Sequence, residues 1–313
     1  MRFRFLWALV ALAAFAYCAW RVAGYVGQYR FGEIAAWFSA VPARHVAVAV
    51  AMAAASYATL TGFDYLAVLY SGHRLPYGKV ALASFVSIAV GYPLGPAPLG
   101  TGAVRYFYYS RLGVGLEAFA RLLLLVMATA MLGKLGFAGL VLLYDPAIVA
   151  GWFSVDASLV VAAAALALAS VALYVLVCAR WRGEVRLGGW RFALPSGTTA
   201  LAQVALGTVD YLCLAGCLHA LMSASAPIPY ATVAAAYVFA NFAALITHVP
   251  GGWGVVEYVV LSLVPGLDSV GALIAFRVIY YLAPLAIGMV LLLAIEGRRS
   301  LAAIWQGRSH KVG

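Results

Sequence analysis

Seven charged side chains lie within stretches of the sequence that are otherwise apolar. They are Asp64, Arg105, Arg121, Lys134, Asp210, Glu257 and Arg277. At about 2.5 to 3.5 kcal/mol for each charge inside a membrane, seven unpaired charges would cost on the order of 20 kcal/mol. We therefore expect them to be paired, hydrated or neutralised. Side chains of both signs in such a setting form ion pairs between helices or bind a charged substrate.

These charges belong to a chain of 313 residues that is 66% hydrophobic and 10% charged, with a mean hydropathy of +0.99. Soluble domains carry about 25% charged residues. The apolar residues form long blocks and do not alternate with polar ones, as they would in a transmembrane β-barrel. We predict an all-α integral membrane protein with a single membrane domain, residues 1–313. The net charge of +10 then reflects topology, and no nucleic acid partner is expected.

Six stretches reach the roughly 20 apolar residues that a helix needs to cross a bilayer. They are approximately residues 5–24, 46–70, 119–144, 158–178, 200–222 and 271–295. Two further apolar regions, 79–110 and 230–264, contain clusters of proline and glycine that interrupt a helix. The second half of each region would be only about 15 to 18 Å long. We predict that each of these regions forms a re-entrant helical hairpin.

The two halves of the sequence repeat the same landmarks in the same order. Asp64-Tyr65-Leu66 recurs as Asp210-Tyr211-Leu212, and the hairpin loops align without gaps. The loop residues are Pro98, Gly100 and Gly102, followed by Arg105 and Tyr106, in the first half, and Pro250, Gly251, Gly252 and Gly254, followed by Glu257 and Tyr258, in the second. Arg121 follows the first loop and Arg277 follows the second. Aligning these two arginines requires a four-residue insertion in the second half. We predict two inverted-topology repeats, approximately 5–150 and 155–296, each with three transmembrane helices and one hairpin, as in many transporters.

The distribution of lysine and arginine predicts the orientation. With the N-terminus in the cytoplasm, the outer loops carry only Arg30 and Arg44, whereas the cytoplasmic segments carry most of the remaining basic residues. The basic tail, residues 297–313, is then cytoplasmic as well. We expect a multi-pass protein of the bacterial inner membrane with both termini on the cytoplasmic side.

Arg105 is the most informative of the buried charges. The loop from Pro98 to Gly102 predicts that Arg105 lies in the first turn of the following helix, where free backbone N–H groups and the helix dipole disfavour a cation unless an anion is near. A lipid phosphate would satisfy the guanidinium and the N–H groups together. A carboxylate partner, with Asp64 as the candidate, is the alternative.

Glu257 occupies the position in the second half that Arg105 occupies in the first. As a first-turn carboxylate it stabilises its own helix, and it could also bind a cationic headgroup. The two positions together offer one positive and one negative pole, which suits a zwitterionic or aminoacylated lipid. Most tyrosines near these charges are interpreted as packing residues, and Lys134 and His248 are assigned no role.

Cysteine and carboxylate patterns raise two other kinds of chemistry. Cys213, Cys217 and His219 could hold a metal, but we favour packing of the thiols as small apolar groups, and no metal or cofactor is expected. Asp64 and Asp210 could form an intramembrane aspartyl protease dyad. The Gly-x-Gly-Asp motif of such proteases is absent, as is a Walker A loop, so we expect that the protein is not an enzyme and does not use ATP directly.

The two loop motifs resemble those of the lysylphosphatidylglycerol synthase transmembrane family, the flippase part of the multiple peptide resistance factor. The resemblance covers roughly residues 5–296, and the Pro-Gly-Gly-Trp-Gly-Val-Val-Glu-Tyr loop is the more specific motif. It implies movement of aminoacylated phosphatidylglycerol between leaflets. The roles of the family's charged residues would fall on Asp64, Arg105, Asp210, Glu257 and Arg277. We expect no aminoacyltransferase domain in this chain, so it resembles the stand-alone members, some of which are associated with hopanoid or other envelope lipids.

These observations predict a flippase-like transporter of an anionic or aminoacylated phospholipid or a related envelope lipid. The expected binding and translocation residues are Asp64, Arg105, Asp210, Glu257, Arg277, Arg121, Tyr106 and Tyr258. The partners would be the phospholipid or glycolipid substrate, a separate lipid-synthesis enzyme, and a second copy of the chain in a homodimer. An ion-coupled small-solute transporter and a lipid-binding partner of an envelope-lipid enzyme, without transport of its own, are the alternative functions.

Overall fold

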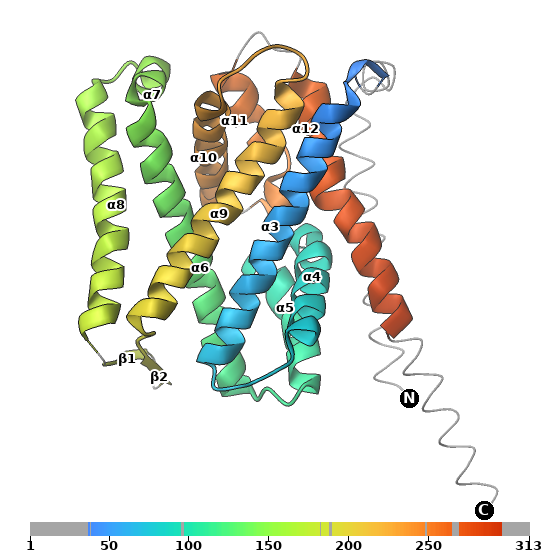
Figure 1. Ribbon diagram of the computed structural model, residues 1–313, viewed down its shortest axis with the longest axis vertical. Coiled ribbons are helices and arrows are strands. Elements are labelled where there is room, and N and C mark those ends of the chain that lie inside the picture. Colours follow the sequence, from blue (N-terminus) through green and yellow to red (C-terminus); the bar gives the residue numbers. More distant parts are fainter. Residues whose placement is uncertain are drawn as a thin grey trace, which may run out of the picture.

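The computed structural model describes residue 37 and residues 39–295, apart from 95–96, 182, 188–189, 248 and 265–268. It is an all-α integral membrane protein with one short β-hairpin (Figure 1). The expected span 5–24, the basic tail 297–313 and His248 lie outside the described residues.

Six helices in the described part of the chain are long and apolar enough to cross a membrane. They are α3 (Ala43–Tyr70), α6 (Leu116–Tyr144), α8 (Ala157–Arg180), α9 (Gly197–Met222), α10 (Tyr230–Thr247) and the last helix, Val270–Ile295. The last helix begins as α12 (Ser269–Arg277) and passes through one turn of π-helix, η2 (Val278–Leu282). All of these except α10 agree with spans predicted from the sequence, because long apolar blocks determine them.

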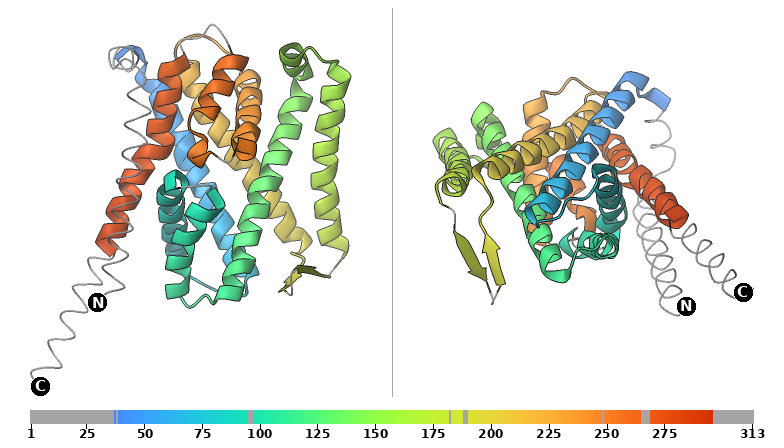
Figure 2. Two further views of the ribbon diagram at one scale, coloured as in Figure 1. Left: turned by 180° about the vertical axis from the view of Figure 1, so that it is seen from behind. Right: turned by 60° about the horizontal axis from the view of Figure 1, so that its bottom comes forward.

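Both interrupted regions form helical hairpins. The first consists of α4 (Tyr77–Leu94) and α5 (Ala97–Arg111), and the second of α10, the 3-10 turn η1 (Pro250–Gly252) and α11 (Val255–Leu263). With 15 and nine residues, α5 and α11 are about 22 and 14 Å long and cannot cross a bilayer alone. In Figures 1 and 2 the α4–α5 hairpin lies beside the lower half of the long helices and the α10–α11 hairpin beside the upper half. The hairpins therefore enter from opposite ends, and η1 at the tip of the second contacts α4 of the first.

The first hairpin differs from the prediction at its loop. Helix α5 already begins at Ala97, so Pro98, Gly100 and Gly102 lie within helical turns and do not form an extended loop. Proline is compatible with the first turn of a helix because the N–H groups there have no intrahelical acceptor. Arg105 is consequently the ninth residue of α5 and not in its first turn, which corrects the expectation that free backbone N–H groups surround it.

The centre of the bundle is the antiparallel pair α3 and α9, which pack along much of their length (Figure 1). Helix α6 crosses α9 where two glycines meet, since a Cβ atom added to Gly133 would lie 2.2 Å from the carbonyl carbon of Gly207. Small residues at such crossings let membrane helices approach closely. The buried apolar core therefore depends on backbone-to-backbone contact at this point.

Two short elements lie outside the helical spans. Helix α7 (Pro146–Phe153) links α6 to α8, and strands β1 (Glu184–Leu187) and β2 (Trp190–Ala193) pair antiparallel, with Glu184 opposite Ala193. This β-hairpin was not predicted from the sequence. The Gly-Gly pair between two alternating segments is its signal in the sequence.

Candidate functional site

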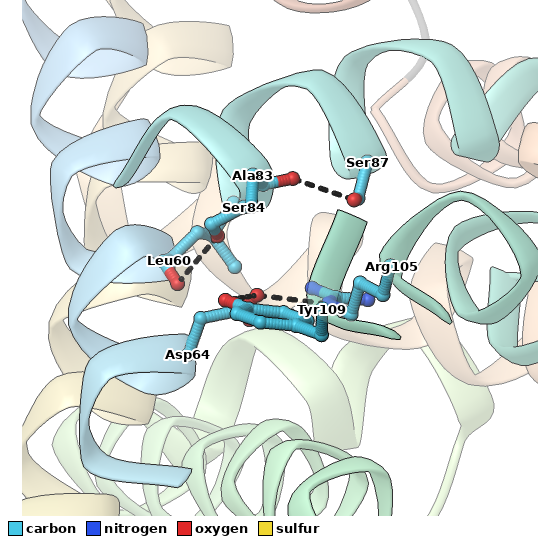
Figure 3. A network of polar contacts seen from close by, with 7 residues as sticks. All are labelled: Leu60, Asp64, Ala83, Ser84, Ser87, Arg105 and Tyr109. Carbon is cyan, nitrogen blue, oxygen red and sulfur yellow. Dashed lines mark hydrogen bonds and ion pairs between the residues drawn. The ribbon is translucent and has the colours of Figure 1, made fainter. Parts of the chain in front are cut away.

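Asp64 and Arg105 form a buried ion pair between α3 and the first hairpin (Figure 3). The Nε–H of Arg105 donates to both carboxylate oxygens of Asp64, at 3.2 Å to Oδ1 and 3.1 Å to Oδ2. The hydroxyl of Tyr109, one helical turn after Arg105, donates to Oδ2 at 2.9 Å. Arg105 is 4% exposed and Asp64 is fully buried. Arg105 thus has the carboxylate partner that the sequence offered as the alternative to an anionic ligand.

The ion pair with Asp64 involves only the Nε–H group of the Arg105 guanidinium. Nη1 and Nη2 of Arg105 donate to no acceptor in the part of the chain that the structure describes, so four of its five N–H groups are without a protein partner. These nitrogens are not fully enclosed, since the fully buried polar atoms without a partner in the described part of the chain do not include them. A group of this kind favours a ligand that supplies two acceptor oxygens side by side, such as a phosphate or a carboxylate.

Arg277 and Glu257 form a second buried pair, between α12 and α11. The Nε–H of Arg277 donates to Oε1 of Glu257 at 2.5 Å, and its terminal nitrogens donate to the carbonyl oxygens of Gly251 at 2.7 Å and Gly252 at 2.9 Å. The guanidinium also lies 4.7 Å from the ring centre of Trp253. All three nitrogens therefore bind the tip of the second hairpin, and this arginine has a structural part in the site.

Backbone geometry explains the glycines of the second loop. Gly251, Gly252 and Gly254 have φ angles of 62°, 61° and 80°, which side chains of L-residues rarely adopt. Glu257 closes the loop, since its Oε2 accepts the N–H of Gly254 at 2.8 Å. The interpretation of Glu257 as a first-turn stabiliser is confirmed, and its carboxylate is shared between this backbone group and Arg277.

Asp210, the sequence counterpart of Asp64, lies in a different environment. It is 4% exposed and accepts hydrogen bonds from the hydroxyls of Ser56 at 2.5 Å and Thr59 at 3.5 Å. The Ser56 hydroxyl lies 2.8 Å from that of Tyr280. No lysine or arginine pairs with Asp210 in the described ranges.

Three expected site residues lie away from these groups. Tyr106 and Tyr258 are 41% and 74% exposed on the outside of their hairpins. Arg121 pairs with Glu117 one turn earlier on α6, and both side chains are partly exposed. The proposed equivalence of Arg121 and Arg277 is not reflected in their environments, because Arg121 is partly exposed on α6 whereas Arg277 is buried against the second hairpin.

Lys134 lies near two aromatic rings, and Cys213 and Cys217 are buried thiols. The ammonium of Lys134 lies 5.7 Å from the ring centre of Tyr211 and 5.4 Å from that of Phe242. Cys213 and Cys217 are buried in α9, and His219 makes a contact of 3.0 Å with the carbonyl oxygen of Ile228. Within the described residues, no three His, Cys, Asp or Glu side chains form a metal-binding group.

Three residues near Asp210 were not predicted from the sequence: Ser56, Tyr57 and Thr59. The hydroxyl of Tyr57 donates to the backbone carbonyl of Tyr280 at 3.2 Å. A signal was available, because Ser56 precedes Asp64 by eight residues and so lies on the same side of the helix, two turns away. The partner on the other helix, Asp210, could not be read from this spacing.

No family model matches the chain. Two curated proteins are similar to it over most of their length. Inner membrane protein YbhN of Escherichia coli is 29% identical over 256 residues, which is 80% of each protein. The uncharacterized protein slr0712 of Synechocystis is 31% identical over 273 residues, which is 86% of this chain and 85% of the relative. The chain therefore belongs to the same family of proteins as slr0712 of Synechocystis.

Proposed function

We propose that the protein moves an anionic or aminoacylated phospholipid, or a related envelope lipid, between the two leaflets of the bacterial inner membrane. The observation that carries this proposal is Arg105, whose Nε is held by Asp64 while both terminal nitrogens have no acceptor in the described part of the chain. A lipid phosphate presents two oxygens at the spacing of those nitrogens. Arg105 binds the phosphate, and Asp64 and Tyr109 hold the guanidinium in position.

The depth of Arg105 supports this role. Helix α3 has 28 residues and is about 42 Å long, which exceeds the roughly 30 Å of the hydrocarbon core. Asp64 lies about 9 Å along the helix from its end at Tyr70. Arg105 is therefore close to the boundary where lipid phosphates lie, and a headgroup needs to move little to reach it while its acyl chains stay in the bilayer.

The hairpins supply the moving parts in this proposal. Two hairpins that enter from opposite ends and touch at α4 and η1 resemble the broken helices of transporters built from inverted repeats. Rocking of one repeat against the other would expose the headgroup site to each leaflet in turn. Arg277 and Glu257 keep the tip of the second hairpin rigid during this motion.

The relatives support the membrane location in this proposal, and the charge distribution supports the orientation. The E. coli relative is named as an inner membrane protein. The basic loops favour cytoplasmic termini for this chain. The loop motifs resemble those of the lysylphosphatidylglycerol synthase transmembrane family, which favours a lipid substrate, and the transport needs neither an enzymatic step nor a cofactor in this chain.

The test is leaflet exchange of fluorescent phospholipids in liposomes that contain the purified protein, with phosphatidylglycerol, its lysyl derivative and phosphatidylcholine compared. The proposal predicts faster exchange than in empty liposomes and a preference among headgroups. Uptake of a small anion without lipid movement would replace it with the solute transporter. Absence of both activities, with co-purification of a lipid-synthesis enzyme, would support a lipid-binding partner.

A further inference from the structure

Asp210 is a buried carboxylate whose described surroundings provide hydroxyls and no cation. It is the fourteenth of the 26 residues of α9, and Ser56 is the fourteenth of the 28 residues of α3. Tyr280 belongs to the π-helical turn near the middle of the last helix. The three side chains form one chain of hydrogen bonds between the middles of three helices, from Asp210 to Ser56 at 2.5 Å and from Ser56 to Tyr280 at 2.8 Å.

This chain of hydrogen bonds is joined to the second hairpin through the backbone. Tyr280 follows Arg277 by three residues, and Arg277 holds the carbonyl oxygens of Gly251 and Gly252 at the hairpin tip. The segment between them is π-helix, a conformation found frequently at functional sites. A change of hydrogen bonding at Asp210 therefore acts on the element that holds the hairpin tip.

The titratable groups that interact with Asp210 come from four elements. They are Tyr57 of α3, Tyr92 of α4, Tyr211 and Cys213 of α9 itself, and Tyr280 and Tyr281 of η2. Among the described residues, three cations lie near these rings: Lys134 over Tyr211, Arg277 over Tyr281, and Arg105 near Tyr92. Tyrosine and cysteine are neutral at pH 7 by their ordinary pKa values, so Asp210 is the acid in this cluster that can carry a negative charge there.

We propose that Asp210 takes up and releases a proton during the transport cycle and so couples lipid movement to the proton gradient. This inference rests on the proposed lipid transport. In the protonated form the carboxyl is neutral, and the energetic penalty of a charge at mid-span is removed. On release the proton passes to water, and the carboxylate accepts the hydrogen of Ser56. A proton fits better than Na⁺, because the hydroxyl of Ser56 donates directly to Oδ1 of Asp210 and leaves no room for an ion between the two oxygens.

The experiment measures lipid exchange in proteoliposomes with and without an imposed pH gradient. In the native protein the gradient shifts the steady-state distribution of the labelled lipid between leaflets. Asp210→Asn can accept the Ser56 hydrogen but cannot ionise, and we expect it to exchange lipid without a gradient and to lose the shift. Asp210→Glu, which stays titratable, retains it. Glu117→Gln is the matched control, because this exposed carboxylate on α6 is remote from the cluster.

A second measurement does not depend on lipid movement. Infrared titration of the native protein in nanodiscs should show a carbonyl band of a protonated carboxylic acid that is missing in Asp210→Asn and present in Glu117→Gln. If that band titrates while no lipid moves, Asp210 binds the proton and the proposed lipid transport is wrong. If lipid moves without a gradient response, if a Na⁺ gradient replaces the pH gradient, or if the band is unchanged in Asp210→Asn, the proton coupling is wrong.

Discussion

Arg105 and Arg277 are both buried beside a carboxylate, but they use their N–H groups differently. Arg277 donates from all three nitrogens to Glu257 and to two backbone carbonyls of the second hairpin. Arg105 donates from Nε alone to Asp64, and its terminal nitrogens have no acceptor among the described residues. The first arrangement stabilises a loop, whereas the second leaves N–H groups available, and these are the groups that we propose bind the lipid phosphate.

Replacement of Glu257 by glutamine should destabilise the fold strongly. The variant leaves the guanidinium of Arg277 buried without a counter-charge, and breaking a buried pair in this way costs about 3 to 5 kcal/mol. Thermal unfolding in detergent would report a clearly lower midpoint. Glu117→Gln, which breaks the exposed pair with Arg121, should cost about 0.2 to 1 kcal/mol. Equal shifts for the two variants would contradict the structural role of the Glu257 pair.

Replacement of Gly133 by alanine should disturb the crossing of α6 and α9. The added methyl group would lie 2.2 Å from the backbone of Gly207, so the helices have to separate. Overpacking of this kind costs about 1 to 3 kcal/mol or more. Gly151→Ala in α7 is the control, because nothing lies within 4 Å of its added Cβ. An unfolding midpoint of Gly133→Ala equal to that of Gly151→Ala would mean that the helices do not cross so closely.

The N-terminus of α8 should contribute a pH-dependent stability. Asp156 accepts the backbone N–H of Ser158 at 2.7 Å, and this hydrogen bond lowers the pKa of the carboxyl below its usual range. A lowered pKa means that the cap is fully effective at neutral pH and is lost as the pH falls through that lowered value. The difference in unfolding midpoint between the native protein and Asp156→Ala should therefore shrink in acid. A difference that stays constant with pH would show that the charge of Asp156 has no part in the cap.

The membrane-spanning helices could be predicted from the sequence because their length and apolarity are local properties. The predicted span 200–222, for example, is α9, Gly197–Met222. Proline and glycine likewise indicated both hairpins. The start of α5 was missed because Pro98 is compatible with a first helical turn and with a loop alike.

The site could be predicted less completely. Asp64, Arg105, Asp210, Glu257 and Arg277 were identified because charges in apolar segments are costly, and the structure buries all five. The hydrogen bonds that Arg277 donates to the second hairpin depend on the positive φ angles of Gly251 and Gly252, which direct two carbonyl oxygens at its guanidinium. No spacing in the sequence reveals this arrangement. The hydrogen bond from Ser56 to Asp210 could not be predicted either, because it depends on the packing of α3 against α9.

The role of Arg105 can be tested without leaving a buried charge unpaired. The single variant Arg105→Gln leaves Asp64 uncompensated, so the double variant Asp64→Asn with Arg105→Gln removes both charges of the pair. Arg180→Gln, an exposed arginine at the end of α8, is the matched control. Size-exclusion chromatography would verify that each variant is folded.

The measurement that tests the central claim most directly is leaflet exchange of fluorescent phosphatidylglycerol in liposomes with these variants. Loss of a charge-assisted contact of about 1.5 to 3 kcal/mol predicts exchange at least tenfold slower in the folded double variant. The native protein and Arg180→Gln should exchange lipid at the same rate. Exchange by the double variant at the native rate would contradict phosphate binding by Arg105.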